Sequence, residues 1–308
     1  AILSPFIDGT DIPTNKGCFV MSQPTSQPTA PSAALTVGQS ASPHSYRLTT
    51  ISCFVGIFVQ AIVSNLTAIL FIPMMDLYGF SYIHLGILVG INFVSQVAAD
   101  ILFSNIIDKK GFRFFVLPTC LIAAGGLLLY TATPLLLPGH EFIGIAVSTV
   151  IFAFSSGLLE VLLSPIVDAI PGNDKGPAMS LMHSFYAWGQ LATIIITTLF
   201  IFFFKGENWQ IIVLIWMVVP LACFFLFLKA PFPPHKSEES RQTMKQLLFR
   251  PYYLLALAAI FCGAGTEVVM NQWASTFMDK ALELPKIAGD LLGMGGFAVM
   301  LGIGRVIY

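Results

Sequence analysis

Charged side chains are scarce in this sequence. Lys, Arg, Asp and Glu make up 10% of its 308 residues, whereas soluble domains carry about 25%. Hydrophobic residues make up 56%, and the mean hydropathy is +0.81. Because an ionised side chain is costly in hydrocarbon, this balance is typical of a chain that lies in lipid. The net charge of −1 offers no basic surface for a nucleic acid, so none is predicted as a partner.

The sequence also lacks the spacings that mark metal centres, disulfide frameworks and known active sites. No two cysteines have Cys-x-x-Cys spacing, and no pair of histidines has metal-ligand spacing, so neither a metal nor a cofactor is predicted. No Gly-x-Ser-x-Gly or aspartate-dyad motif occurs in the apolar segments, which argues against an intramembrane enzyme. We interpret the five cysteines as small core residues: Cys18, Cys53, Cys120, Cys223 and Cys262.

Long apolar runs account for most of the chain. Crossing about 30 Å of hydrocarbon takes about 20 residues of helix. The runs are continuously apolar rather than alternating, which favours helices over barrel strands. No signal-peptide cleavage pattern follows the first run, so we expect it to be retained. The sequence therefore predicts an all-α membrane protein with eight spanning helices, at 50–74, 84–107, 112–133, 143–169, 178–204, 208–229, 251–277 and 287–308.

Polar segments divide these runs into groups. Residues 1–46 are rich in Pro, Ser and Thr and are predicted to form a disordered N-terminal tail, with Met21 as a possible true start. The charged stretch 230–250 is predicted to be a cytoplasmic linker between the six helices of 47–229 and the two of 251–308. Six helices, a linker and further helices are the layout of a transporter built from two six-helix halves. On that interpretation the second bundle is incomplete.

The basic residues predict the orientation. Cytoplasmic loops accumulate Lys and Arg. With the tail inside, twelve of the fifteen basic residues lie in cytoplasmic segments, and only Lys205, Lys280 and Lys286 lie outside. We therefore expect a multi-pass protein of the cell membrane with a cytoplasmic N-terminus.

The turn after the second apolar run carries a recognisable motif. Residues 104–113 resemble the loop motif of the major facilitator superfamily, Gly-x-x-x-Asp-Arg/Lys-x-Gly-Arg-Lys/Arg, with Ser104 and Phe112 as departures. Gly111 permits a tight reversal, and Asp108 can cap or pair with a neighbouring helix end. The motif predicts a gate latch, and the alternative is an ordinary basic cytoplasmic turn. The matching residues are Asp108, Lys109, Gly111 and Arg113.

A second resemblance is to one branch of that superfamily, the fucose-galactose-glucose:proton symporters. It lies in four stretches, 157–165, 178–190, 263–273 and 302–305, and the direct matches in the first two are Leu159, Glu160, Pro165, Phe185 and Gly189. The first helix departs from the branch, because it lacks an aspartate and offers Gln60, Ser64, Asn65 and Thr67 instead. The resemblance implies a monomeric protein with the major facilitator fold that carries a small polar solute, such as a sugar, together with protons.

Three carboxylates lie inside apolar runs: Asp100, Glu160 and Glu267. A lone carboxylate at mid-helix costs at least ~2.5 kcal/mol, so each is expected to face the bundle interior, a partner or water. We interpret all three as proton-coupling candidates. Glu160 is the first choice because it lies near mid-span, and its alternative role is that of a permanently protonated hydrogen-bonding group. For Asp100 an interhelical or gate contact is the favoured alternative.

Polar residues at helical spacing predict the lining of a cavity. Asn92, Gln96 and Asp100 follow one another at i, i+4 steps, as do Glu267 and Asn271. Gly263 and Gly265 are expected to loosen their helix. The alternatives are packing roles, an interface tryptophan for Trp273 and a satisfied interhelical histidine for His183. The predicted substrate-binding residues are Gln60, Asn65, Asn92, Gln96, His183, Trp188, Gln190, Asn271, Gln272 and Trp273. Trp209 and Trp216 are expected to be lipid or interface anchors.

These features favour a secondary transporter that moves a small polar solute by alternating access and is driven by protons. A non-transporting membrane receptor or sensor is one alternative, supported only by the tail. An exporter of hydrophobic compounds is another, although the polar lining argues for hydrophilic cargo.

Overall fold

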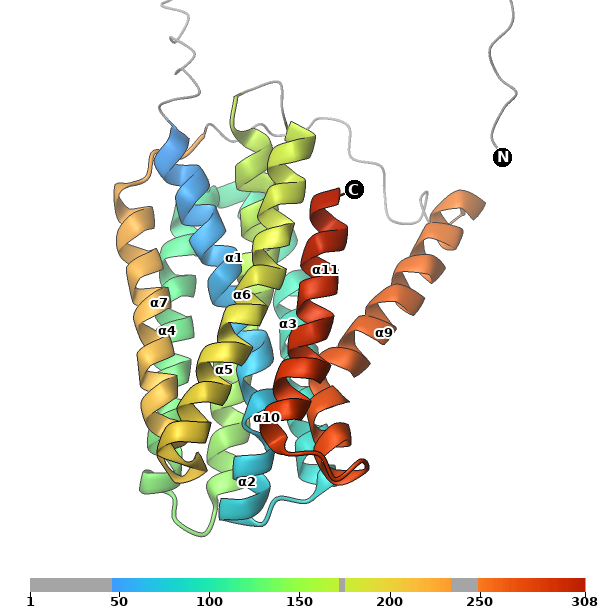
Figure 1. Cartoon of the computed structure of the whole chain (residues 1–308). Coiled ribbons are helices and arrows are strands. Elements are labelled where there is room, and N and C mark those ends of the chain that lie inside the picture. The colour runs from blue at the N-terminus through green and yellow to red at the C-terminus, as the bar shows by residue number, and fades with distance from the viewer. Residues whose placement is uncertain (1–45, 172–174, 234–248, 308) are drawn as a thin grey trace, which may run out of the picture. The chain divides into compact units, whose positions relative to one another are not determined.

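The computed structural model describes residues 46–171, 175–233 and 249–307, which belong to the unit Ser40–Tyr308 (Figure 1). The predicted tail, apart from Tyr46, and most of the predicted linker lie outside these residues. The described residues form helices and no strands: α1 (Arg47–Ile69), α2 (Phe71–Tyr78), α3 (Tyr82–Lys110), α4 (Phe112–Leu136), α5 (Glu141–Ala169), α6 (Lys175–Phe204), the 3-10 helix η2 (Gly206–Asn208), α7 (Trp209–Lys229), α9 (Pro251–Lys280), α10 (Lys286–Ala288), the π-helix η3 (Gly289–Gly295) and α11 (Gly296–Ile307).

Within that part of the chain, eight helices are long and apolar enough to cross a membrane. They coincide with the eight predicted runs to within a few residues at each end, so the all-α membrane prediction is confirmed. The helices from α1 to α7 are called the first helix group below, and those from α9 to α11 the second helix group. Successive spans run in opposite directions, and the start of α1 and the end of α11 lie at the same end (Figure 1).

The first predicted helix, 50–74, is broken rather than continuous. It ends at Ile69, and a short second helix begins at Phe71. Pro73 explains the break, because proline has no N–H to donate to the carbonyl four residues earlier and its ring crowds that carbonyl.

α1 is the central helix of the described structure. It is buried over 78% of its apolar window, the highest share among the eight spans, and it contacts α5, α6, α7 and α9. Small residues allow the surrounding helices to approach closely. A Cβ at Gly157 of α5 would lie 2.9 Å from the Gln96 Cα of α3, so only glycine fits where these two helices meet. This close contact sets the register between the polar faces of α3 and α5.

The two tryptophans of α7 are buried, so their prediction as lipid or interface anchors was wrong. Trp209 and Trp216 are 0% and 5% exposed. The Trp209 Nε1–H donates to Tyr78 Oη over 3.2 Å, and the Trp216 Nε1–H donates to Thr197 Oγ1 over 2.9 Å. An indole can be buried in this way because its single N–H finds a partner inside the bundle.

α9 is one continuous α-helix, so the prediction that Gly263 and Gly265 loosen it is also wrong. Glycine lowers helix propensity by about 1 kcal/mol but keeps its N–H, so the hydrogen-bonded ladder can continue through both positions. The first half of α9 is largely exposed and leans away from the other helices, and its second half packs against them (Figure 1). Cys262 lies on the exposed half, whereas Cys53, Cys120 and Cys223 are buried as expected. Cys18 lies outside the described residues.

Candidate functional site

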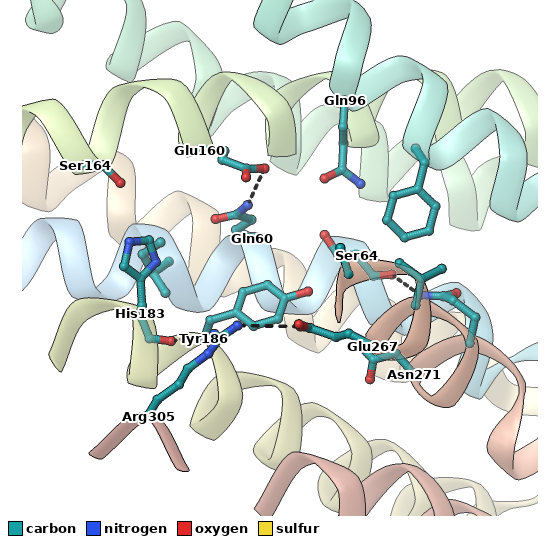
Figure 2. Close-up of a pocket in the computed structure, with 15 residues that line it drawn as sticks. Gln60, Ser64, Gln96, Glu160, Ser164, His183, Tyr186, Glu267, Asn271 and Arg305 are labelled. Atoms are coloured by element: carbon teal, nitrogen blue, oxygen red, sulfur yellow. Dashed lines mark hydrogen bonds and ion pairs between the residues drawn. The ribbon is translucent and has the colours of Figure 1, made fainter. Parts of the chain in front are cut away.

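A cavity of about 290 Å³ lies among α1, α3, α5, α6, α9 and α11 (Figure 2). Its volume is near the lower end of the range for small-molecule sites, about 300–1,000 Å³. Four apolar residues contribute to its wall, including Ile57 and Phe93. The remaining lining residues are polar or charged: Gln60, Ser64, Gln96, Glu160, Ser164, His183, Tyr186, Glu267, Asn271, Gln272 and Arg305. Both helix groups therefore contribute polar atoms to one space.

Glu160 belongs to the polar face of α5. Its carboxylate is open to the cavity and accepts a hydrogen bond from Gln60 Nε2 over 3.2 Å (Figure 2). One turn away, the Ser156 hydroxyl lies 3.1 Å from that of Ser64 and donates to Gln96 Oε1 over 3.3 Å. The hydrogen-bonding groups on this face of Glu160 are therefore neutral, and no cation is paired with it among the described residues.

Glu267 enters the same cavity from α9 and has a cationic partner. Arg305 of α11 places Nη2 3.6 Å from Glu267 Oε1, and its Nη1 donates to the backbone carbonyl of His183 over 3.0 Å. The guanidinium also lies 5.9 Å from the ring centroid of Tyr186. Arg305 thus connects the second helix group to α6 at one end of the cavity (Figure 2).

The two carboxylates differ in what protonation would change. Protonating Glu267 removes the counter-charge of Arg305, so it alters an ion pair that is only about 30% exposed. Protonating Glu160 leaves its amide partner Gln60 in place, because an amide can accept from the acid as well as donate to the anion. Glu160 can therefore change charge with little rearrangement around it.

Amide side chains join the two helix groups beside the cavity. Gln190 of α6 is hydrogen-bonded to Asn271 of α9, and Gln272 Nε2 donates to the backbone carbonyl of Ser64 over 3.2 Å. Asn271 and Gln272 line the cavity, whereas Gln190 is fully buried behind it. These bonds hold α9 against α1 and α6 at mid-height.

The structure brings seven of the predicted site residues into the cavity, namely Gln60, Gln96, Glu160, His183, Glu267, Asn271 and Gln272. Two other predicted amides hold helices instead of lining it. Asn65 Nδ2 donates to the Ala61 carbonyl over 2.8 Å, and Asn92 Nδ2 donates to the Val63 carbonyl over 3.5 Å. Asn92 also accepts from Gln96. Their side-chain N–H groups therefore donate to protein atoms, one within α1 and one between α3 and α1.

The predicted aromatic residues Trp188 and Trp273 lie outside the cavity lining. Trp273 packs on Phe71, with ring centroids 5.5 Å apart. Trp188 is 40% exposed and lies against Gly302 of α11. Tyr186, which was not among the predicted site residues, does line the cavity, as do Phe93 and His183. Its position could have been predicted from that of His183, because Tyr186 follows three residues later and so lies on the same face of the helix.

Asp100 lies on α3 one turn beyond Gln96 and is not part of the cavity wall. It is close enough to Glu160 for the two charges to interact. Its Oδ1 atom is buried and has no hydrogen-bond partner among the described residues. Asp100 is therefore placed behind Glu160 on the side of the α3–α4 turn.

The α3–α4 turn has the geometry that the motif predicts at its glycine. Gly111 ends α3 with φ +85°, a conformation that favours glycine. Arg113 Nη2 donates to the Leu228 carbonyl over 3.0 Å, and its guanidinium lies 5.9 Å from the Phe232 ring centroid. The side chains of Asp108 and Lys109 lie outside the described atoms. The Arg113 contacts connect the turn to the end of α7, within the first helix group.

Arg305 was the other missed residue, although a signal for it exists. It is a cation within an apolar run, and such a residue is expected to pair with an intramembrane carboxylate. Three such carboxylates lie inside apolar runs of the sequence, Asp100, Glu160 and Glu267. The packing of α9 against α11 determines that Arg305 pairs with Glu267.

A bundle of apolar helices that encloses a polar, carboxylate-containing cavity between two helix groups is typical of a multi-pass membrane transporter. The sequence model of the Major Facilitator Superfamily matches residues 53–307. The chain belongs to this superfamily, and it is a transporter rather than an enzyme.

One solved structure shows how far the fold is shared. The chain is similar to a crystal structure of a point variant of the fucose:proton symporter of E. coli, with a TM-score of 0.61 and 16% sequence identity. The similarity covers 85% of this chain and 70% of that chain. It establishes the same all-α fold. A comparison with curated proteins finds no match.

Proposed function

We propose that this protein carries a small polar solute across the cell membrane by alternating access, coupled to protons. The observation that carries the proposal is that Glu160 of the first helix group and Glu267 of the second line one cavity. A carrier needs a site whose occupancy and protonation bias one access state over the other. When the two helix groups move relative to each other, the distances between residues of different groups change, whereas those between residues of one group do not.

The lining supports a hydroxylated solute of sugar size. Amide and hydroxyl groups from four helices can exchange hydrogen bonds with ring hydroxyls, and the Tyr186 ring offers an aromatic face for the C–H side of a sugar. The similarity in fold to a fucose:proton symporter agrees with this class of cargo. We further propose the fucose-galactose-glucose:proton symporter branch as the subgroup.

Protons are the proposed coupling ion, with Glu160 as the main site. Glu160 is open to the cavity, and among the described residues its carboxylate is hydrogen-bonded to the neutral Gln60 and paired with no cation, so it can load and release a proton without breaking an ion pair. Asp100 lies behind it and is proposed to accept the proton on the side of the α3–α4 turn. We propose that Glu267 couples the occupancy of the cavity to the position of α11 through its ion pair with Arg305.

Counterflow is the experiment that tests transport itself. The purified protein is reconstituted into liposomes preloaded with an unlabelled hexose, and entry of the same labelled hexose is followed against empty liposomes. We expect labelled sugar to accumulate transiently and excess unlabelled sugar to abolish the signal. Exchange of hydrophobic cations but no polar solute would indicate an exporter instead. Sugar binding without any exchange would indicate a receptor.

The proposed orientation places the start of α1 in the cytoplasm, as the distribution of basic residues indicates. Cysteines introduced one at a time at Lys205 and Arg113, after Cys18 and Cys262 are replaced by alanine, test it. Both positions are exposed, and they lie at opposite ends of the spans. A membrane-impermeant maleimide added to intact cells is expected to label Lys205→Cys and not Arg113→Cys. The reverse pattern would invert the topology.

A further inference from the structure

A second polar cluster lies away from the cavity, around Asp290 in the π-helix η3. Asp290 is 0% exposed. Its carboxylate accepts a hydrogen bond from Thr198 Oγ1 over 2.8 Å and is also bonded to the Ser275 hydroxyl and to the Lys286 ammonium. Burying a carboxylate is costly unless it is paired and hydrogen-bonded. The cluster meets that requirement with one cation and two hydroxyls.

The partners of Asp290 come from both helix groups. Ser275 lies on α9 and Lys286 on α10, so these two bonds stay within the second helix group. Thr198 lies on α6 in the first helix group. The bond from Thr198 to Asp290 is therefore the member of the cluster that joins the two groups.

The local backbone is built to bring Asp290 to α6 and α9. A π-helix is rare, and short π segments are frequent at functional positions. Its glycines allow close contact, since a Cβ at Gly289 would lie 2.8 Å from the Ser275 carbonyl oxygen and one at Gly293 would lie 3.2 Å from Met278 Sδ. This close packing of η3 against α9 fixes the position of the Asp290 carboxylate.

The cluster and Arg305 mark opposite ends of the same seam between α6 and the second helix group. Thr198 and His183 are separated by about 22 Å at 1.5 Å per helical residue, and Asp290 and Arg305 by a similar length. His183 and Tyr186, the α6 residues that line the cavity, lie on the Arg305 side of Thr198. Beyond the cluster, Lys286 borders a separate hollow of about 330 Å³ together with Asp76, Lys205 and Glu207.

We infer that Asp290 is a clamp residue for transport. In the observed state the Thr198–Asp290 bond holds α6 and η3 together at the end opposite Arg305, and the cavity opens toward that end when the bond breaks. Water from the hollow beside Lys286 then hydrates the separated groups, while Ser275 and Lys286 keep their bonds to Asp290. The clamp rests on the alternating access proposed above and adds a residue that the cavity does not contain.

The test compares two hydroxyl deletions that differ only in the helix group they come from. Cys18 and Cys262 are first replaced by alanine. Spin labels are then attached at Phe202→Cys on α6 and Leu292→Cys on η3, two positions near this end of the seam whose native side chains are 61% and 70% exposed. Thr198→Val removes the bond between the groups and keeps the side-chain shape. Ser275→Ala, the matched control, removes a bond to the same carboxylate within the second group.

Distances between the labels are measured by pulsed electron resonance in nanodiscs. Thr198→Val is expected to raise the ratio of long to short distances on the order of tenfold, as loss of a hydrogen bond to a charged group predicts, and Ser275→Ala is expected to leave it unchanged. Asp290→Ala, which removes the acceptor of the Thr198 hydroxyl, is expected to act as Thr198→Val does. Equal distributions in the Thr198→Val and Ser275→Ala proteins, whether both shifted or both unshifted, would overturn the clamp.

Counterflow on the same proteins separates this inference from the proposed function. If Thr198→Val lengthens the distances while the parent exchanges no polar solute, the clamp stands and the proposed cargo fails. If the parent exchanges a sugar while Thr198→Val leaves the distances unchanged, the clamp alone fails.

Discussion

Replacing Glu160 by glutamine is expected to abolish proton-driven accumulation of the solute while leaving exchange largely intact. Glutamine has nearly the same shape and can still bond to Gln60, which contacts the carboxylate over 3.2 Å, but it cannot take up or release a proton. A carrier that cannot load a proton cannot use a proton gradient to shift its access equilibrium. In liposomes with an imposed pH gradient, the internal solute concentration should rise only to the external one.

Glu141→Gln is the matched control for this change. Glu141 begins the same helix, α5, but it lies outside the cavity and bonds to the backbone N–H of Gly139. It should accumulate solute as the parent protein does, which excludes a general effect of removing a carboxylate from α5. Full accumulation by the Glu160→Gln protein would show that another group carries the proton. Loss of counterflow in that protein would instead assign Glu160 to solute binding.

Breaking the Glu267–Arg305 pair is expected to produce the second large effect. Glu267→Gln leaves the Arg305 guanidinium in the cavity without its counter-charge, and Arg305→Gln leaves the Glu267 carboxylate without its partner. The pair is about 30% exposed, so screening lessens the loss relative to a fully buried pair. We expect each single variant to weaken solute binding roughly tenfold, because a loss of about 1.4 kcal/mol corresponds to that factor.

The double variant Glu267→Gln with Arg305→Gln distinguishes an ion pair from two separate contacts. If the two side chains act on each other, the double variant should bind better than the sum of the two losses predicts, and the non-additivity measures their coupling. Binding measured by calorimetry on the four proteins provides the cycle. Strict additivity would mean that each residue contacts the solute independently. Asp279→Asn, which alters a carboxylate paired with Lys280 at the end of the same helix α9, is the control.

The shape of the cavity wall also depends on hydrogen bonds made behind it, by side chains that do not line the cavity. Asn92 of α3 donates to the Val63 carbonyl of α1, Asn65 of α1 donates to Tyr186 Oη of α6 over 3.4 Å, and Gln190 is hydrogen-bonded to Asn271 from behind the cavity. Substitutions at these three positions are therefore expected to move lining residues without removing any atom that faces the solute. They are poor choices for assigning solute contacts.

The spanning helices and their polar faces could be predicted from the sequence alone. The number and ends of the spanning helices follow from the length and composition of apolar runs, which are local properties. Helical spacing likewise placed Asn92 with Gln96 and Glu267 with Asn271 on shared faces, because a side chain's direction repeats every 3.6 residues. Those faces, together with the cost of charge in hydrocarbon, were enough to select Glu160 and Glu267 before any packing was known.

The tertiary structure alone decided which faces meet. Trp209 and Trp216 are buried because Tyr78 and Thr197 lie within reach of their N–H groups, and no local pattern in α7 marks those partners. The pairing of Arg305 with Glu267 and the bond from Thr198 to Asp290 join residues far apart along the chain. Composition and periodicity describe one helix at a time, whereas these contacts depend on the position and rotation of two helices relative to each other.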